Sequence, residues 1–178
     1  SGARRAVEVL NLTPDDGLRF IAGCPPDANP PLNLEAADRF TAVLAALSRQ
    51  CDVILIDAGH GMNPWVDRLW QLSCEVLLTS PPTAQGLLDA YAVAKLSQHH
   101  RHDAKLRLLV NRTRDQHEAR PLGHRFAETC QRFLNIRAKP AASLPAFDLR
   151  PSDSTSAQRQ QERDAFQRAL RLLAAALS

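Results

Sequence analysis

The sequence lacks the features that define several large classes of protein. No apolar run approaches the roughly 18 residues of a membrane-spanning helix, and the N-terminus has no apolar core of a signal peptide. Glycine occurs only seven times, which excludes collagen, and 44% hydrophobic residues exclude a wholly disordered chain. With 178 residues, the chain is long enough to bury a core, and we expect one domain over residues 1–178.

The charge and cysteine patterns exclude further kinds of protein. Lys and Arg number 22 against 19 Asp and Glu, and the positive charges are spread along the chain. Nucleic-acid binding requires a concentrated basic face, so the sequence predicts no nucleic-acid partner. Cys24, Cys51, Cys74 and Cys130 lie far apart and form no C-x-x-C pair. This spacing predicts buried, reduced thiols in a cytosolic protein rather than disulfides or zinc ligands.

Apolar runs and helical periods alternate along the chain. The spacing of apolar residues predicts helices over residues 34–49, 64–72, 83–98, 118–134 and 157–177, the last of which closes the chain within residues 157–178. Short apolar runs predict strands over residues 18–22, 53–56, 75–79 and 106–110, with a short edge strand within 135–156. This alternation predicts an α/β fold with a mostly parallel sheet and helices on both faces.

The residues that directly follow the predicted strands are the candidate site. Ligands of open parallel sheets bind at the carboxyl ends of the strands. Asp57 follows the run at residues 53–56, and its carboxylate can hold a hydrated Mg²⁺. Gly59 and Gly61 come next, and glycines can present bare backbone N–H groups to an anion, although they can equally shape a simple turn. Asn111 ends another predicted strand, so we expect it at the same sheet edge as Asp57.

Four segments in this order resemble the MinD/ParA family of deviant P-loop ATPases, and most of all its FlhG/FleN branch of flagellar-number regulators. The segments are DVILIDAGHG at residues 52–61, EVLLTSPPT at 75–83, LDAYAVAK at 88–95 and LVNR at 109–112. The resemblance implies a P-loop NTPase fold that binds ATP and Mg²⁺. It also implies that the parent protein is an ATPase and an ATP-dependent homodimer. Such a protein would act in the cytoplasm or peripherally at the inner face of the cell membrane, on a protein partner of a flagellar, division or polar assembly.

On the phosphate side, the resemblance implies roles for Asp57, Gly59 and Gly61. Asp57 would hold Mg²⁺ through water, and the two glycines would lie near the γ-phosphate as part of the catalytic switch loop. His60 stands where the family prefers a small residue, so it would crowd or tune the γ-phosphate. The 178 residues contain no G-x-x-x-x-G-K-[ST] loop. The resemblance therefore makes this chain the C-terminal two-thirds of an N-terminally truncated ATPase domain, and we expect the chain alone not to hydrolyse ATP.

On the base side, the resemblance implies that Asn111 reads the adenine edge, with Arg112 beside it. Pro145, in the segment SLPAFD at residues 143–148, would lie against the base. An amide donates and accepts side by side, which suits adenine. Pro82 matches the proline before a helix used in dimer and partner contacts, whereas Gln85 replaces the threonine of the family.

Other interpretations remain beside the ATPase. The main alternative is a degenerate, non-catalytic partner-binding module of the same fold. A receiver domain would need a lysine nearer to Asp57 than Lys139. His99, His100 and His102 follow a helix end and lack converging acidic or cysteine ligands, so they predict no metal site. The closing helix has a basic side and an apolar side, and we expect it to pack in the core rather than to bind a membrane.

Overall fold

The computed structural model describes residues 11–12, 19–23, 33–97, 104–147 and 156–177. By its internal contacts the chain divides into two units, Ser1–Asp57 and Ala58–Ser178. The single domain expected from the length stays a prediction. Cys24 and the histidines at positions 99, 100 and 102 lie outside the described residues.

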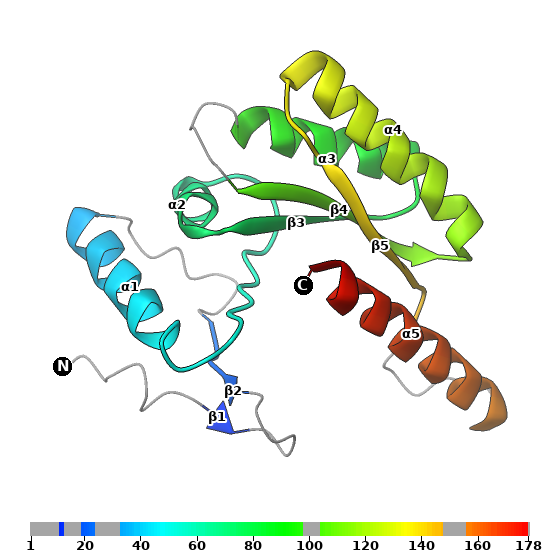
Figure 1. Ribbon diagram of the computed structural model, residues 1–178, viewed down its shortest axis with the longest axis horizontal. Coiled ribbons are helices and arrows are strands. Elements are labelled where there is room, and N and C mark those ends of the chain that lie inside the picture. The colour runs from blue at the N-terminus through cyan, green and yellow to red at the C-terminus, as the bar shows by residue number, and fades with distance from the viewer. Residues whose placement is uncertain (1–10, 13–18, 24–32, 98–103, 148–155, 178) are drawn as a thin grey trace. The chain divides into compact units, whose positions relative to one another are not determined.

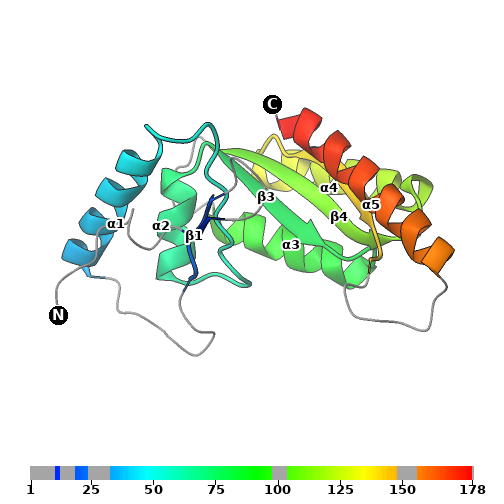
Figure 2. The ribbon, with the colours of Figure 1, turned by 90° about the horizontal axis from the view of Figure 1, so that it is seen from below.

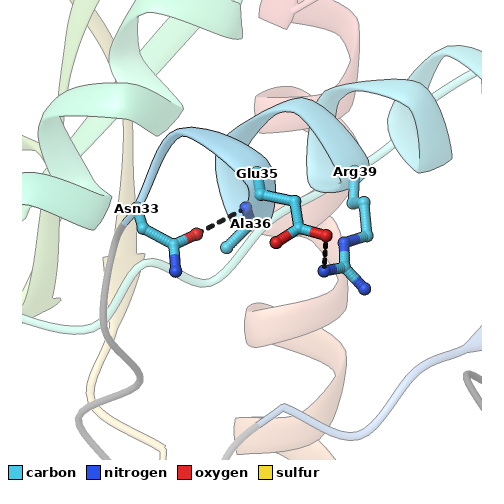
Figure 3. Close-up of polar contacts among 4 residues, drawn as sticks. All are labelled: Asn33, Glu35, Ala36 and Arg39. Carbon is cyan, nitrogen blue, oxygen red and sulfur yellow. Dashed lines mark hydrogen bonds and ion pairs between the residues drawn. The ribbon is translucent and has the colours of Figure 1, made fainter.

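In the described part of the first unit there are one long helix and one short strand pair. Two-residue strands β1 (Asn11–Leu12) and β2 (Arg19–Phe20) pair antiparallel. Helix α1 (Leu34–Leu47) begins where the apolar spacing predicts, because Asn33 caps it. The Asn33 side-chain oxygen accepts the N–H of Ala36 at 2.8 Å, and Glu35 pairs with Arg39 one turn along the helix (Figure 3).

The strand predicted at residues 53–56 is wrong. These residues adopt no regular secondary structure, and Val53 and Leu55 are 79% and 88% exposed. A strand needs a neighbour for its backbone N–H and C=O groups. No strand among the described residues pairs with this segment. An apolar, β-branched composition alone therefore does not make a strand here, and Asp57 does not follow one.

The second unit is built on a three-stranded parallel sheet in the order β3-β4-β5. The strands are β3 (Glu75–Ser80), β4 (Lys105–Thr113) and β5 (Lys139–Pro145). The helices of this unit are α2 (Pro64–Leu72), α3 (Ala84–Ser97), α4 (Gln116–Leu134) and α5 (Ser156–Leu177). Helices α3 and α4 cover one face of the sheet and α5 covers the other (Figures 1 and 2). The predicted α/β fold class is confirmed, and the arrangement is consistent with a P-loop NTPase-like fold.

Strand β4 lies in the middle of the sheet and is buried on both faces. Its alternate residues Leu106, Leu108 and Val110 join the cluster beneath α3 and α4. Leu109 points to the other face and packs in the cluster with Leu173 of α5. This alternation follows from the period of two along a strand, and it explains why β4 reads as an almost continuous apolar run.

Side-chain caps set the starts of α2 and α4. Asn63 accepts the N–H groups of Trp65 and Val66 at 2.9 and 3.0 Å, with Pro64 in the first turn of α2. Asp115 accepts the N–H of Glu118 at 2.9 Å and so begins α4 directly after β4. None of the helices among the described residues is long and apolar enough to cross a membrane.

The prediction of buried thiols holds for one described cysteine and is wrong for two. Cys130 lies in α4 and is fully buried, whereas Cys51 and Cys74 are exposed. Cys51 follows the end of α1, and Cys74 lies in the turn before β3, so neither is inside the apolar segment beside it. Burial raises the pKa of the Cys130 thiol from its ordinary value of 9.0 to about 11.

Gly86 lies where α3 closely approaches the segment that precedes it. A Cβ atom at this position would lie 2.7 Å from the Pro81 ring and from Oγ of Ser80. The first turn of α3 therefore lies against the end of β3, and only a residue without a side chain fits there.

We predict that Gly86→Ala lowers the free energy of unfolding by about 1–3 kcal/mol, because the added methyl group overpacks this contact. A glycine-to-alanine change inside a helix normally stabilises the protein, so a fall in the free energy of unfolding would point to overpacking. Urea titration followed by circular dichroism measures the change. Gly23→Ala is the control, since a Cβ there meets nothing within 4 Å. A gain in stability for Gly86→Ala would contradict the close contact.

We predict that a thiol reagent at pH 8 modifies Cys51 and Cys74 of the folded protein and spares Cys130. The reactive species is the thiolate, and the pKa of about 11 keeps the buried Cys130 thiol protonated at that pH. The folded state binds the proton of the Cys130 thiol more tightly than the unfolded state does. The stability that this tighter binding contributes is therefore lost as pH rises between 9 and 11. Peptide mass spectrometry identifies the modified cysteines, and equal modification of all three would contradict the burial.

Candidate functional site

The segment at residues 57–61 combines a carboxylate with two glycines in the left-handed backbone region. Gly59 and Gly61 have φ angles of +71° and +76°. A Cβ at either position would meet nothing within 4 Å, so backbone conformation rather than space favours glycine there. The exposed His60 lies between them. The backbone therefore turns sharply at this loop, as the glycines predict.

Asp57 is exposed, and it follows an irregular segment rather than a strand end. It belongs to the first unit, whereas Asn111 belongs to the second. The prediction that Asp57 lies at a strand end is therefore wrong, and its placement relative to Asn111 stays a prediction.

The carboxyl ends of β4 and β5 bring together the residues predicted for the base side. In the parallel register Asn111 lies opposite Leu144, and Thr113 lies opposite Pro145. Asn111, Arg112 and Pro145 are thus neighbours at one edge of the sheet, although more than 30 residues separate them along the chain. Parallel pairing explains this, because it aligns the carboxyl ends of adjacent strands.

The register between β4 and β5 shifts at Arg112. This exposed residue has a φ of +63°, a left-handed conformation that non-glycine residues rarely adopt. Its N–H donates to Oδ1 of Asn111 at 2.9 Å. Two further bonds join the strands, from the Thr113 hydroxyl to the Leu144 carbonyl at 3.2 Å and from the Ala146 N–H to the Thr113 carbonyl at 3.3 Å. We call Asn111, Arg112, Thr113, Leu144 and Ala146 the β4–β5 junction.

The Asn111 side chain is half-buried and held in one orientation by the junction. Its Oδ1 accepts the Arg112 N–H and keeps a second lone pair for another donor. Among the described residues no partner accepts from its Nδ2 amide group. The amide can therefore offer both a donor and an acceptor to a planar heterocycle.

The segment after β3 is ordered by local hydrogen bonds rather than by charge. The Thr83 hydroxyl accepts the N–H of Gly86 at 3.0 Å and so caps α3. Gln85, which replaces the threonine of the resembled family, donates to Asp89 at 2.8 Å one turn along the helix. Pro82 precedes this cap, so it leads into α3 as predicted.

The described residues offer few potential metal ligands close together. No group of three His, Cys, Asp or Glu side chains among them could hold a metal ion. Mg²⁺ does not need such a group, since it commonly keeps its waters and uses one carboxylate with the phosphates of a substrate. Asp57 has the chemistry for that role.

Sequence reasoning missed Thr113. This residue is 3% exposed and joins the ends of two strands, yet a threonine at the end of a strand carries no distinguishing signal. Only the partner carbonyl of Leu144 shows what its hydroxyl does.

Comparison with known proteins adds one partial likeness. The chain is 27% identical over 99 residues to the antiactivator FleN of Pseudomonas aeruginosa. The matched stretch covers 56% of this chain and 35% of FleN, so the chain spans about a third of that relative. No protein-family model matches the chain. The likeness supports a FleN-like relationship over part of the chain, and it agrees with the parallel α/β sheet of the second unit.

We predict that Arg112→Gly raises the free energy of unfolding by about 1 kcal/mol, because glycine adopts the left-handed conformation without the steric cost of a Cβ. The same change at Arg120, exposed in α4, is the control and should lower stability by about 1 kcal/mol. Urea titration of both variants tests the pair. A loss of stability for Arg112→Gly would show that the backbone of residue 112 is not left-handed in solution.

Proposed function

We propose that the full-length protein is an ATP-dependent dimerising switch of the MinD/ParA type, related to FleN. It would position or number flagella or another assembly at the cell pole or the membrane. In this proposal the protein works in the cytoplasm or at the inner face of the membrane, and ATP hydrolysis resets it. The observation that carries the proposal is the meeting of Asn111, Arg112 and Pro145 at the carboxyl edge of a parallel sheet.

The β4–β5 junction supports a base-binding role. Asn111 presents an amide whose Nδ2 hydrogens have no acceptor among the described residues. Pro145 lies opposite Thr113 on the adjacent strand, so its apolar ring belongs to the same sheet edge as that amide. An amide beside an apolar surface suits an adenine base, which needs edge hydrogen bonds and face contacts together.

The loop at residues 57–61 supports a phosphate and Mg²⁺ role. Asp57 would hold Mg²⁺ through water, and the positive φ angles of Gly59 and Gly61 let the loop turn close to an anion. Bound Mg²⁺ would neutralise charge on the phosphates. A G-x-x-x-x-G-K-[ST] loop is absent from the 178 residues, so the proposal requires the phosphate-binding loop to come from elsewhere in the protein.

Helix α3 supports a contact with another protein. Leu88 and Leu96 are 61% and 50% exposed, and the exposed Ala92 lies between them. Spacing of four residues places all three on one face of α3. An apolar stripe on a helix whose opposite side is already buried fits a dimer or partner interface.

A second candidate function is a non-catalytic partner-binding module of the same fold. The exposed stripe on α3 favours it, together with the absence of a phosphate-binding lysine loop from these residues. This module would bind a protein partner without responding to ATP.

We predict that the full-length protein elutes as a dimer with ATP and as a monomer with ADP in size-exclusion chromatography. Asp57→Ala should reduce the Mg²⁺-dependent dimer, because it removes the carboxylate proposed to hold the ion. Asp52→Ala is the matched control, an exposed carboxylate five residues earlier that should leave the dimer unchanged.

His60→Ala should shift the monomer–dimer balance more than it changes ATP affinity, since His60 lies between the proposed switch glycines.

The two candidate functions give different outcomes in this experiment. An elution position that is the same with ATP and ADP, together with no ATP binding by calorimetry, would favour the partner-binding module. ATP binding that persists equally in the Asp57 and Asp52 variants would show that Asp57 does not hold the metal ion.

A further inference from the structure

The β4–β5 junction contains a buried hydroxyl that the proposed function does not use. Thr113 is 3% exposed at the end of β4, one of few buried polar side chains among the described residues. Its hydroxyl donates to the carbonyl of Leu144 on β5 at 3.2 Å. A buried hydroxyl is stabilised in such a place only by a hydrogen bond, so this bond defines the orientation of the side chain.

The bond lies where the backbone pairing of the two strands is interrupted. Arg112 adopts a φ of +63° and has no partner in the register with β5, between the pairs Asn111–Leu144 and Thr113–Pro145. The Arg112 N–H turns to Oδ1 of Asn111. The Thr113 hydroxyl therefore adds a link between the strands immediately beside the irregularity.

Both residues proposed to contact the base lie beside this link in the strand register. Asn111 lies opposite Leu144, the residue whose carbonyl accepts from Thr113, and Pro145 lies opposite Thr113 itself. The Thr113 carbonyl also accepts the N–H of Ala146, directly after Pro145. Loss of the hydroxyl would loosen the spacing between the Asn111 amide and the Pro145 ring without removing either group.

We propose that Thr113 is a positioning residue that sets the distance between Asn111 and Pro145 and thereby the selectivity for adenine over other bases. This inference rests on the proposed nucleotide-binding function. Thr113 itself contacts no base in this proposal and acts through its bond to the Leu144 carbonyl. A positioning role of this kind follows from the general requirement that binding groups be held rigidly by the residues behind them.

The test compares ADP with GDP, which share their phosphates and differ in the base. The full-length protein is titrated with each by calorimetry, as wild type and as Thr113→Val, which keeps the shape and removes the hydroxyl. We expect ADP affinity to fall about tenfold, the equivalent of one hydrogen bond, with little change for GDP. Thr113→Ser retains the hydroxyl and should restore ADP affinity.

Combining Thr113→Val with Asn111→Ala should weaken ADP no further than Asn111→Ala alone, because the two residues act on the same contact. Thermal melting by circular dichroism confirms that each variant is folded at the titration temperature. Equal losses for ADP and GDP, or an additive double variant, would show a merely structural role and overturn the inference. Wild-type protein that binds neither nucleotide would overturn the proposed function and this inference with it.

Discussion

Strand β4 is paired on both edges and buried on both faces, and the second unit depends on this double constraint. Pairing with β3 and β5 satisfies its backbone groups, while alternate side chains fill the clusters beneath α3 and α4 on one face and α5 on the other. Because such a strand cannot shift by one residue without reversing its faces, its register is strongly determined. The position of Asn111 at its end follows directly from that register.

The register of β4 with β5 shifts between Leu108 and Leu109 and again where the candidate site begins. Arg112 takes a left-handed conformation, and the register with β5 shifts around it. Backbone strain of this kind persists where surrounding bonds hold it, and it gathers at functional sites. Here those bonds come from Asn111, Thr113 and Ala146, so the strained residue lies within a hydrogen-bonded frame rather than in a loose loop.

The partial likeness to FleN and the parallel α/β sheet of the second unit are compatible with each other. One compares residues along a stretch of 99 positions, and the other concerns which residues meet in space.

Local signals in the sequence determined the helices of this protein. Asn33 and Asn63 cap helices that begin where the apolar spacing predicts, and Asp115 begins α4 at Gln116, before the predicted start at residue 118. A capping side chain acts on N–H groups two or three residues away, so its signal is local. The apolar run at residues 106–110 predicts a strand for a similar local reason, but β4 continues through Asn111 to Thr113. Tertiary structure decided the remainder. Residues 53–56 have the composition of a strand but pair with no strand among the described residues, and the Thr113 hydroxyl gains its partner from the Leu144 carbonyl. Strand pairing joins residues far apart in the chain. Neither composition nor spacing along the sequence shows which residue will be the partner.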